Sequence, residues 1–372
     1  MELTNREFRL QMQLQKVGLL IKEEQLKRNP HFFRLYQIGR DLCSDITEDT
    51  IDFHIVDSSS INAIAAYPTK SIVICRGALN AILRIAEAIV ESNLFPEMMG
   101  RFHPSVPKYE NSSLQDVRKN ILKPDEDFTL SHNESAWADD FERNNLFNII
   151  SELLISFLVC HEIGHHFNKH GDRRRRGEDF SVDVDEMQGP VGSGSLDKQA
   201  IESVADDCGF QILVQKFDRR LRLPNPLRIP SVSLLKNKFF QHQGGLMLRC
   251  YQIAFIYFWL METPGWESVD PMEWLYPPAG FRLHTIYASS LENPPLELSR
   301  SALFGLLEDA LTTSSEIVAT AFSIQMDIQW LTQMGSYSTH AAEVLDRMTH
   351  WSCEGSGVWE PYSDNSTELA VT

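Results

Sequence analysis

The feature that most constrains this chain is a pair of histidines at the end of a long apolar run. "LFNIISELLISFLVC" occupies residues 146–160, and "HEIGHHFNKHGD" follows at once, with His161 and His165 four positions apart. On a helix, residues at this spacing lie on one face, one turn apart, so their rings can bind a single ion. Glu162 is offset around the helix and can reach a metal-bound water. This HExxH pattern predicts a zinc site with its general base.

A catalytic zinc ion needs a third protein ligand and one open position. The metzincin pattern HExxHxxGxxH would supply a histidine, but the chain has Asn168 and Gly171 where that pattern requires glycine and histidine. A carboxylate from a following helix is the other common solution. In the expected helix 196–217, "ESVAD" places Glu202 and Asp206 on one face. We predict Glu202 as the third ligand and Asp206 as a carboxylate that orients a ligand histidine.

The charge of the chain limits its partners. A formal net charge of −17 argues against general binding of nucleic acid or anionic membranes, because phosphates require a basic surface. The basic run at residues 173–176 is followed closely by acidic residues, and we interpret it as a solvated loop. We therefore expect no nucleic-acid partner.

Three features predict a cytoplasmic protein without a membrane span. The start, "MELTNREFRLQMQLQKVGLL", lacks the apolar core of a secretory signal. The apolar runs 146–160 and 251–261 are shorter than the roughly 20 residues of a spanning helix. The six cysteines are scattered without a CxxC pair, which is typical of reduced core thiols rather than of a disulfide framework.

Periodicity predicts an α+β fold. Short β-like runs at 50–56, 61–67 and 70–76 precede a helix at 78–95, and a second long helix over about 145–170 is expected to end at Gly171 as its C-cap. The polar segment 95–144 reads as a surface insertion. The expected parts are a helical segment at 1–45, a domain over 46–295 with that insertion and a flexible loop at 172–195, C-terminal helices at 296–350, and a disordered tail at 351–372.

Four segments, spread from about residue 60 to 285, resemble the gluzincin metallopeptidases of the family that includes HtpX and the CaaX prenyl proteases. "INAIAAYPTKSIVICRGAL" is similar to that family's Asn-Ala strand, Pro-containing turn, second strand and Gly-capped helix start. "HEIGHHFNKH" is similar to its HExxH with a further histidine five residues on, here His170. "ESVADDCG" is similar to its E-x-x-A-D-x-x-G, and "YPPAGFRL" to its late His-Pro-Pro…Arg-Ile/Leu element.

The resemblance implies a zincin-like metallopeptidase domain with a small mixed sheet, an HExxH helix and an ExxxD helix, followed by a largely helical C-terminal part. It implies one Zn²⁺ per chain, held by His161, His165 and Glu202. Glu162 would be the catalytic base and Asp206 the residue that orients a histidine. The remaining histidines of the segment, at 166 and 170, are not expected to be ligands.

The resemblance also implies a substrate strand. Asn62 and Ala63 would belong to an edge strand along which an extended peptide binds through main-chain hydrogen bonds. Tyr276 stands where the family usually has histidine, and its O–H could stabilise a developing oxyanion. Arg282 could orient this late element or bind the substrate, and a structural role is equally open for both residues. The relatives are often embedded in membranes, so their lipid-linked or membrane substrates are not carried over to this chain.

Together these observations predict a soluble, zinc-dependent endopeptidase that hydrolyses a protein or peptide substrate with a metal-activated water. Such an enzyme must be restrained in the cell, as a stress-response or phage-defence protease is. The loop 177–195 and the segment 95–144 are candidates for a lid or a partner-gated element. The alternative is a non-catalytic zinc-binding protein that holds a partner peptide at the strand of Asn62, against which the intact Glu162 argues.

Overall fold

The computed structural model describes residues 5–92, 94–98, 113–130, 137–171, 196–224, 229–261, 270–274, 277–324 and 337–352. These residues are mostly helical with one small mixed sheet, which is compatible with the expected α+β class. The helices are α1 (Asn5–Lys16), α2 (Glu23–Leu26), α3 (Pro30–Thr47), α4 (Arg76–Glu91), α5 (Leu114–Asp116), α6 (Phe141–Phe167), α8 (Leu196–Arg222), α9 (Pro230–Leu234), α10 (Gln243–Met261), α11 (Ala279–Glu292), α12 (Arg300–Phe322) and α14 (Ser338–Trp351). Tyr276, the loop 172–195 and residues 353–372 lie outside the described part.

The sheet contains the three strands that the sequence predicted, β1 (Asp52–Val56), β2 (Ala63–Ala66) and β3 (Ser71–Cys75), in the order β1-β3-β2. β3 is central, parallel to β1 and antiparallel to β2. β2 is therefore an edge strand, as expected, and pairs with no second strand in the described part of the chain.

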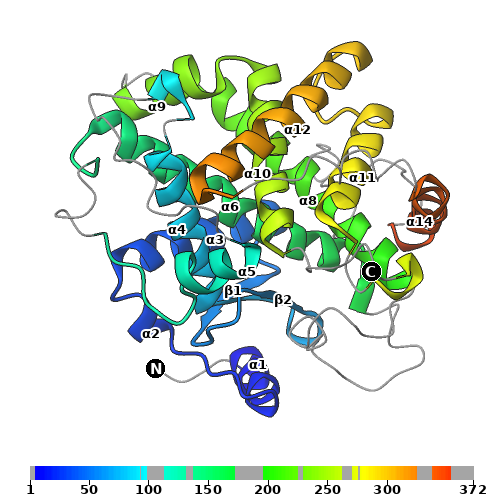
Figure 1. The fold of residues 1–372 in the computed structure, drawn as a ribbon. Coiled ribbons are helices and arrows are strands. Elements are labelled where there is room, and N and C mark those ends of the chain that lie inside the picture. Colours follow the sequence, from blue (N-terminus) through cyan, green and yellow to red (C-terminus); the bar gives the residue numbers. More distant parts are fainter. Residues whose placement is uncertain are drawn as a thin grey trace.

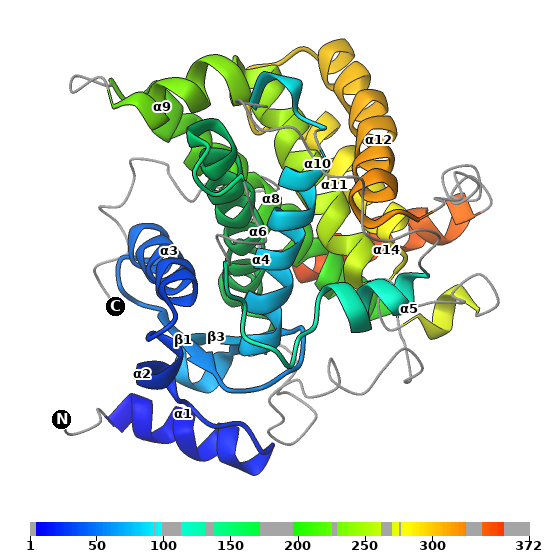
Figure 2. The ribbon, with the colours of Figure 1, turned by 60° about the vertical axis from the view of Figure 1, so that its left-hand side comes forward.

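Both faces of the sheet are covered. Alternate side chains of the strands, including Ile64 and Val73, pack with Leu10 and Leu14 of α1 in a small apolar cluster. The other face joins the main core, where α3, α4 and α6 lie above it (Figures 1 and 2). The sheet is thus a buried layer between α1 and the helical body.

The main core is continuous across the expected parts of the chain. It extends from Leu26 to Phe322 and includes side chains of α3 and of α12. α6 lies at its centre and contacts α3, α4, α8, α10 and β2. The boundaries expected at residues 45 and 295 remain predictions, and the apolar core crosses both.

The segment 95–144 differs from the expected surface insertion. Its described side chains contribute to the main core, where the following seven are buried: Phe95, Met98, Val117, Leu122, Phe128, Trp137 and Ala138. Few apolar residues in a polar stretch give no periodic signal, yet each large one removes substantial apolar surface from water. The description as a surface insertion is therefore wrong for these residues.

The end of α6 also differs from expectation. The helix begins after Asp140, whose side chain accepts hydrogen bonds from the N–H groups of two following residues, and it ends at Phe167 rather than at Gly171. Lys169, not a glycine, takes the left-handed conformation with φ 54°. Gly171 instead allows a close contact, since a Cβ atom there would lie 2.2 Å from Cγ of Tyr67.

α6 has 27 residues and, by length and composition alone, is apolar enough to span a membrane, although the apolar run was expected to be too short. Most of its apolar stretch is buried inside the protein, which is typical of a core helix and consistent with a soluble protein. The five cysteines of the described residues are buried, and none of them forms a disulfide within this part of the chain.

Candidate metal centre

The last turns of α6 bring the two motif histidines together. His161 and His165 are both buried, and their Nε2 atoms lie 3.1 Å apart. The 3.6-residue repeat of the helix places the two rings on one face, as the sequence predicted. The nitrogens that can bind an ion thus point to one place.

α8 supplies the carboxylate. Glu202 is buried. Its Oε2 atom lies 3.4 Å from Nε2 of His161, and its Oε1 atom lies 3.6 Å from Nε2 of His165. The two helices run antiparallel, because Gly164 faces Ala205 while Gly209 faces His161. The sequence expectation that Glu202 joins the two histidines agrees with this placement.

The three side chains fit a metal ion. One ligand atom from each of His161, His165 and Glu202 lies within 4.8 Å of the others, and all three residues are buried. Two ligands of a tetrahedral zinc ion, each about 2.0–2.1 Å from the metal, are roughly 3.3 Å apart. The observed separations of 3.1, 3.4 and 3.6 Å are of this size. This buried group could therefore hold a metal ion.

Two glycines allow the helices to approach this closely, and the sequence reasoning missed their role. A Cβ atom on Gly209 would lie 2.7 Å from the backbone nitrogen of His161, and one on Gly164 would lie 2.9 Å from the backbone oxygen of Ala205. Glycine inside a helix costs about 1 kcal/mol relative to alanine, so its presence there was a signal for close packing.

Asp206 joins the first histidine to a third helix. Its Oδ1 lies 2.9 Å from Nδ1 of His161, although the ring N–H is not aligned with it as in an ideal hydrogen bond. Arg282 of α11 binds both oxygens of Asp206 through Nε and Nη2, each at 2.7 Å, and stacks over the ring of Phe258. Arg282 is itself buried, and these contacts are those of a residue that orients Asp206.

The buried charges perturb each other. Burial opposes the charged form of His161, but the adjacent carboxylates of Asp206 and Glu202 outweigh it and raise the pKa of His161 to about 10. Burial likewise opposes ionisation of Glu202, yet His165 and His161 hold its pKa well below the usual range. Burial raises the pKa of Glu162, which lies beside His161 on α6. The acidic and basic side chains of this buried group therefore shift each other's pKa values.

The other two histidines have different surroundings. Nε2 of His166 lies 3.1 Å from the carbonyl oxygen of Ser71, and its ring packs against Tyr67, on the side of the sheet. His170 is fully buried and contacts His165 through their Nδ1 atoms at 2.9 Å. Neither belongs to the group of three residues that could hold a metal ion, which agrees with the sequence expectation.

Asn62 precedes the edge strand and Ala63 begins it. Oδ1 of Asn62 accepts a hydrogen bond from the N–H of Ala63, and its carbonyl accepts one from the N–H of Cys75. Nδ2 of Asn62 is buried and has no hydrogen-bond partner among the described residues. Tyr276, the predicted oxyanion donor, lies outside the described residues.

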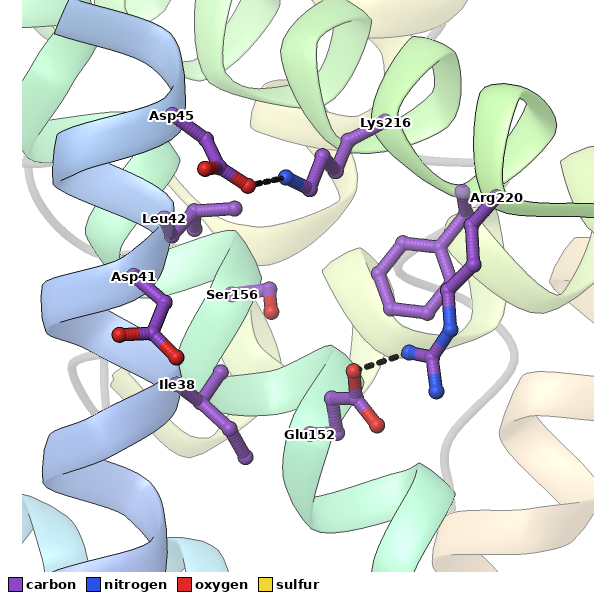
Figure 3. A pocket seen from close by; sticks show the side chains of 9 residues that line it. Ile38, Asp41, Leu42, Asp45, Glu152, Ser156, Lys216 and Arg220 are labelled. Carbon is purple, nitrogen blue, oxygen red and sulfur yellow. Dashed lines mark hydrogen bonds and ion pairs between the residues drawn. The ribbon is translucent and has the colours of Figure 1, made fainter. Parts of the chain in front are cut away.

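A cleft lies at the opposite end of the α6–α8 pair. It has a volume of about 200 Å³ and is lined by α3, α6 and α8, with ion pairs between Lys216 and Asp45 and between Arg220 and Glu152 (Figure 3). None of the predicted site residues lines it. The candidate metal site of His161, His165 and Glu202 is therefore separate from this cleft.

Comparisons with known proteins identify no relative. No protein-family model matches the chain, and searches of curated proteins and of solved structures also find no match. The assignment of function therefore rests on the residues and on the geometry described above.

Proposed function

We propose that this protein is a cytoplasmic, zinc-dependent endopeptidase of the gluzincin type. The observation that carries the proposal is the buried convergence of His161, His165 and Glu202, with Glu162 on the same helix turn as the histidines. The order of the two helical motifs in the sequence and the edge position of β2 support the same reading.

In this proposal His161, His165 and Glu202 hold one zinc ion. Bound zinc supplies a Lewis acid that polarises a carbonyl group and lowers the pKa of a water. Asp206, fixed by Arg282, holds a proton on Nδ1 of His161, so that the Nε2 lone pair of this ring is free for the metal. The burial of these groups keeps their relative positions fixed.

Glu162 acts as general base and then as general acid. Its carboxylate takes a proton from the attacking water and returns it to the leaving amine, so that no covalent intermediate with the protein is required. Asn62 and Ala63 contribute substrate binding in this proposal, because they lie at the start of edge strand β2, along which an extended peptide would pair through main-chain hydrogen bonds.

The test compares wild type with Glu162→Gln. Both proteins should bind one zinc ion per chain, measured by elemental analysis, while cleavage of a proteome-derived peptide library falls about 100-fold or more in the variant. Glu152→Gln is a matched control on the same helix, at the exposed end of the α6–α8 pair, and should cleave like wild type.

Two results would overturn the proposal. If wild type and Glu162→Gln bind zinc equally and neither cleaves any peptide, the protein is a zinc-containing binding protein, for which the edge of β2 would hold a partner. If Glu202→Ala leaves the affinity for zinc unchanged, Glu202 is not the third ligand. Unrestrained cleavage of casein by the purified protein would contradict the expectation of a regulatory partner or lid.

A further inference from the structure

A chain of contacts connects the second ligand histidine to the C-terminal helix. Nδ1 of His165 lies 2.9 Å from Nδ1 of His170, and Nε2 of His170 lies 3.1 Å from the main-chain oxygen of Trp351. Trp351 is the last residue of α14. It lies 181 positions after His170 in the sequence.

Only one arrangement of protons satisfies these contacts. Nε2 of His165 faces His161 and Glu202, so a metal-bound His165 carries its proton on Nδ1 and donates it to His170. His170 then accepts at Nδ1 and must carry its own proton on Nε2. That proton goes to the carbonyl of Trp351, which can only accept.

The carbonyl of Trp351 is suited to this task by its position. The last four carbonyl groups of a helix have no partner within the helix, and they form the negative end of its dipole. α14 ends at Trp351, so this acceptor points out of the helix toward the imidazole N–H of His170.

α14 is held in place by the helix that carries the third ligand. Asp197, in the first turn of α8, forms an ion pair with Arg347 and accepts a hydrogen bond of 2.9 Å from Nε1 of Trp351. Nε2 of His340, near the start of α14, lies 2.7 Å from Oε1 of Gln199 in α8. The position of the Trp351 carbonyl therefore depends on the docking of α14 onto α8.

We propose that α14 is a part of the metal centre, in which the Trp351 carbonyl and His170 position His165, so that the docking of α14 sets how tightly the site binds zinc. This inference rests on the metal site of the proposed function and does not require that the protein hydrolyse peptides. His170 is a positioning residue here and not a ligand.

The first test measures zinc affinity by competition with a chromophoric chelator, and the absorption spectrum of the Co²⁺ form, in full-length proteins. His170→Leu removes the acceptor and should weaken zinc binding about 10- to 100-fold and alter the Co²⁺ spectrum. His170→Gln can accept from His165 and donate to Trp351, and should recover most of the affinity. His166→Leu, a neighbouring histidine that faces the sheet, should bind zinc like wild type.

The second test addresses α14 itself. Asp197→Ala should weaken zinc binding and increase amide exchange in residues 338–351, whereas Asp45→Ala, which removes an exposed ion pair elsewhere, should do neither. The double variant His170→Leu/Asp197→Ala should bind zinc no more weakly than His170→Leu alone, because both changes act through one path. The Asp197 comparison also stands if His170→Leu does not fold, which thermal melts would reveal.

The inference is overturned if His170→Leu binds zinc like wild type, or if His170→Gln and His170→Leu weaken zinc binding equally. It is also overturned if the losses of zinc affinity in Asp197→Ala and His170→Leu add in the double variant. A wild type that binds zinc tightly but cleaves nothing would defeat the proposed hydrolysis and leave this inference intact. A wild type that binds no zinc would overturn both.

Discussion

The two ends of the α6–α8 pair carry acids and cations that lie in opposite environments. At one end Glu152 pairs with Arg220 beside the cleft, with side chains 23% and 45% exposed (Figure 3). At the other end Asp206 pairs with Arg282, with side chains 0% and 6% exposed. The solvated pair thus joins α6 to α8, whereas the buried pair joins α8 to α11.

The difference in water access decides what each pair can do. Water screens an exposed pair, whose contribution to stability is typically about 0–1 kcal/mol. A buried pair has lost its hydration and needs every partner in place, since removing one leaves an uncompensated charge. Such a site keeps its groups in fixed positions, which is what metal binding requires and what a flexible surface pair cannot provide.

The largest expected effect comes from Arg282→Met. This substitution leaves the buried Asp206 without its bidentate partner and should lower the free energy of unfolding by about 3–5 kcal/mol. Urea unfolding of the zinc-free protein measures it. Arg282→Met/Asp206→Leu should recover much of the stability but not the zinc affinity, because His161 then lacks its carboxylate. A loss below about 1 kcal/mol for Arg282→Met would contradict the contrast between the two ends.

Gly209→Ala tests the close approach of the helices. The added methyl group meets the backbone of His161, which cannot move as a flexible side chain can, so we expect a loss of about 1–3 kcal/mol and weaker zinc binding. Gly305→Ala is a control, because a Cβ atom at this position of α12 meets nothing within 4 Å and should be tolerated. Unchanged zinc affinity in Gly209→Ala would show that the spacing is not needed.

Asp207 tests the pH dependence of the buried end. Burial raises the pKa of this half-buried carboxyl to about 6, against hydrogen bonds from Ser289 and Gln211 that lower it. The folded state therefore binds the proton more tightly than the unfolded state, and the stability this provides is present below about pH 4 and is lost as the pH rises through 6.

Asp207→Asn removes this loss of stability with rising pH. The variant should be more stable than wild type by about 1–2 kcal/mol above pH 6, and the difference should shrink toward zero near pH 4. Thermal or urea unfolding between pH 4 and pH 8 measures it. A difference that is constant with pH would mean that Asp207 ionises as it does in the unfolded chain.

The smallest expected effect comes from the exposed end. Arg220→Met makes the same substitution as Arg282→Met but at a solvated pair, and should change the free energy of unfolding by no more than about 1 kcal/mol. Added salt should reduce the difference further, because it screens exposed charges. A loss as large as that of Arg282→Met would remove the distinction between the ends.

Local patterns in the sequence were enough to predict much of the site. The spacing of His161 and His165, and that of Glu202 and Asp206, predicted two helix faces, and the three strands followed from short apolar runs between turn residues. These predictions succeed because the helical and strand repeats fix which side chains of one element share a face. The sequence reasoning also separated the two histidines of the candidate metal site from His166.

Only the tertiary structure decided which distant residues complete the site. The pairing of Arg282 with Asp206, the contact of His170 with the Trp351 carbonyl, and the glycines at the helix crossing each depend on how separate elements pack. Scattered apolar residues of the segment 95–144 joined the core for the same reason. The sequence by itself determined the faces of the two helices, whereas packing decided what meets those faces, because side-chain periodicity carries no information about the partner across the interface.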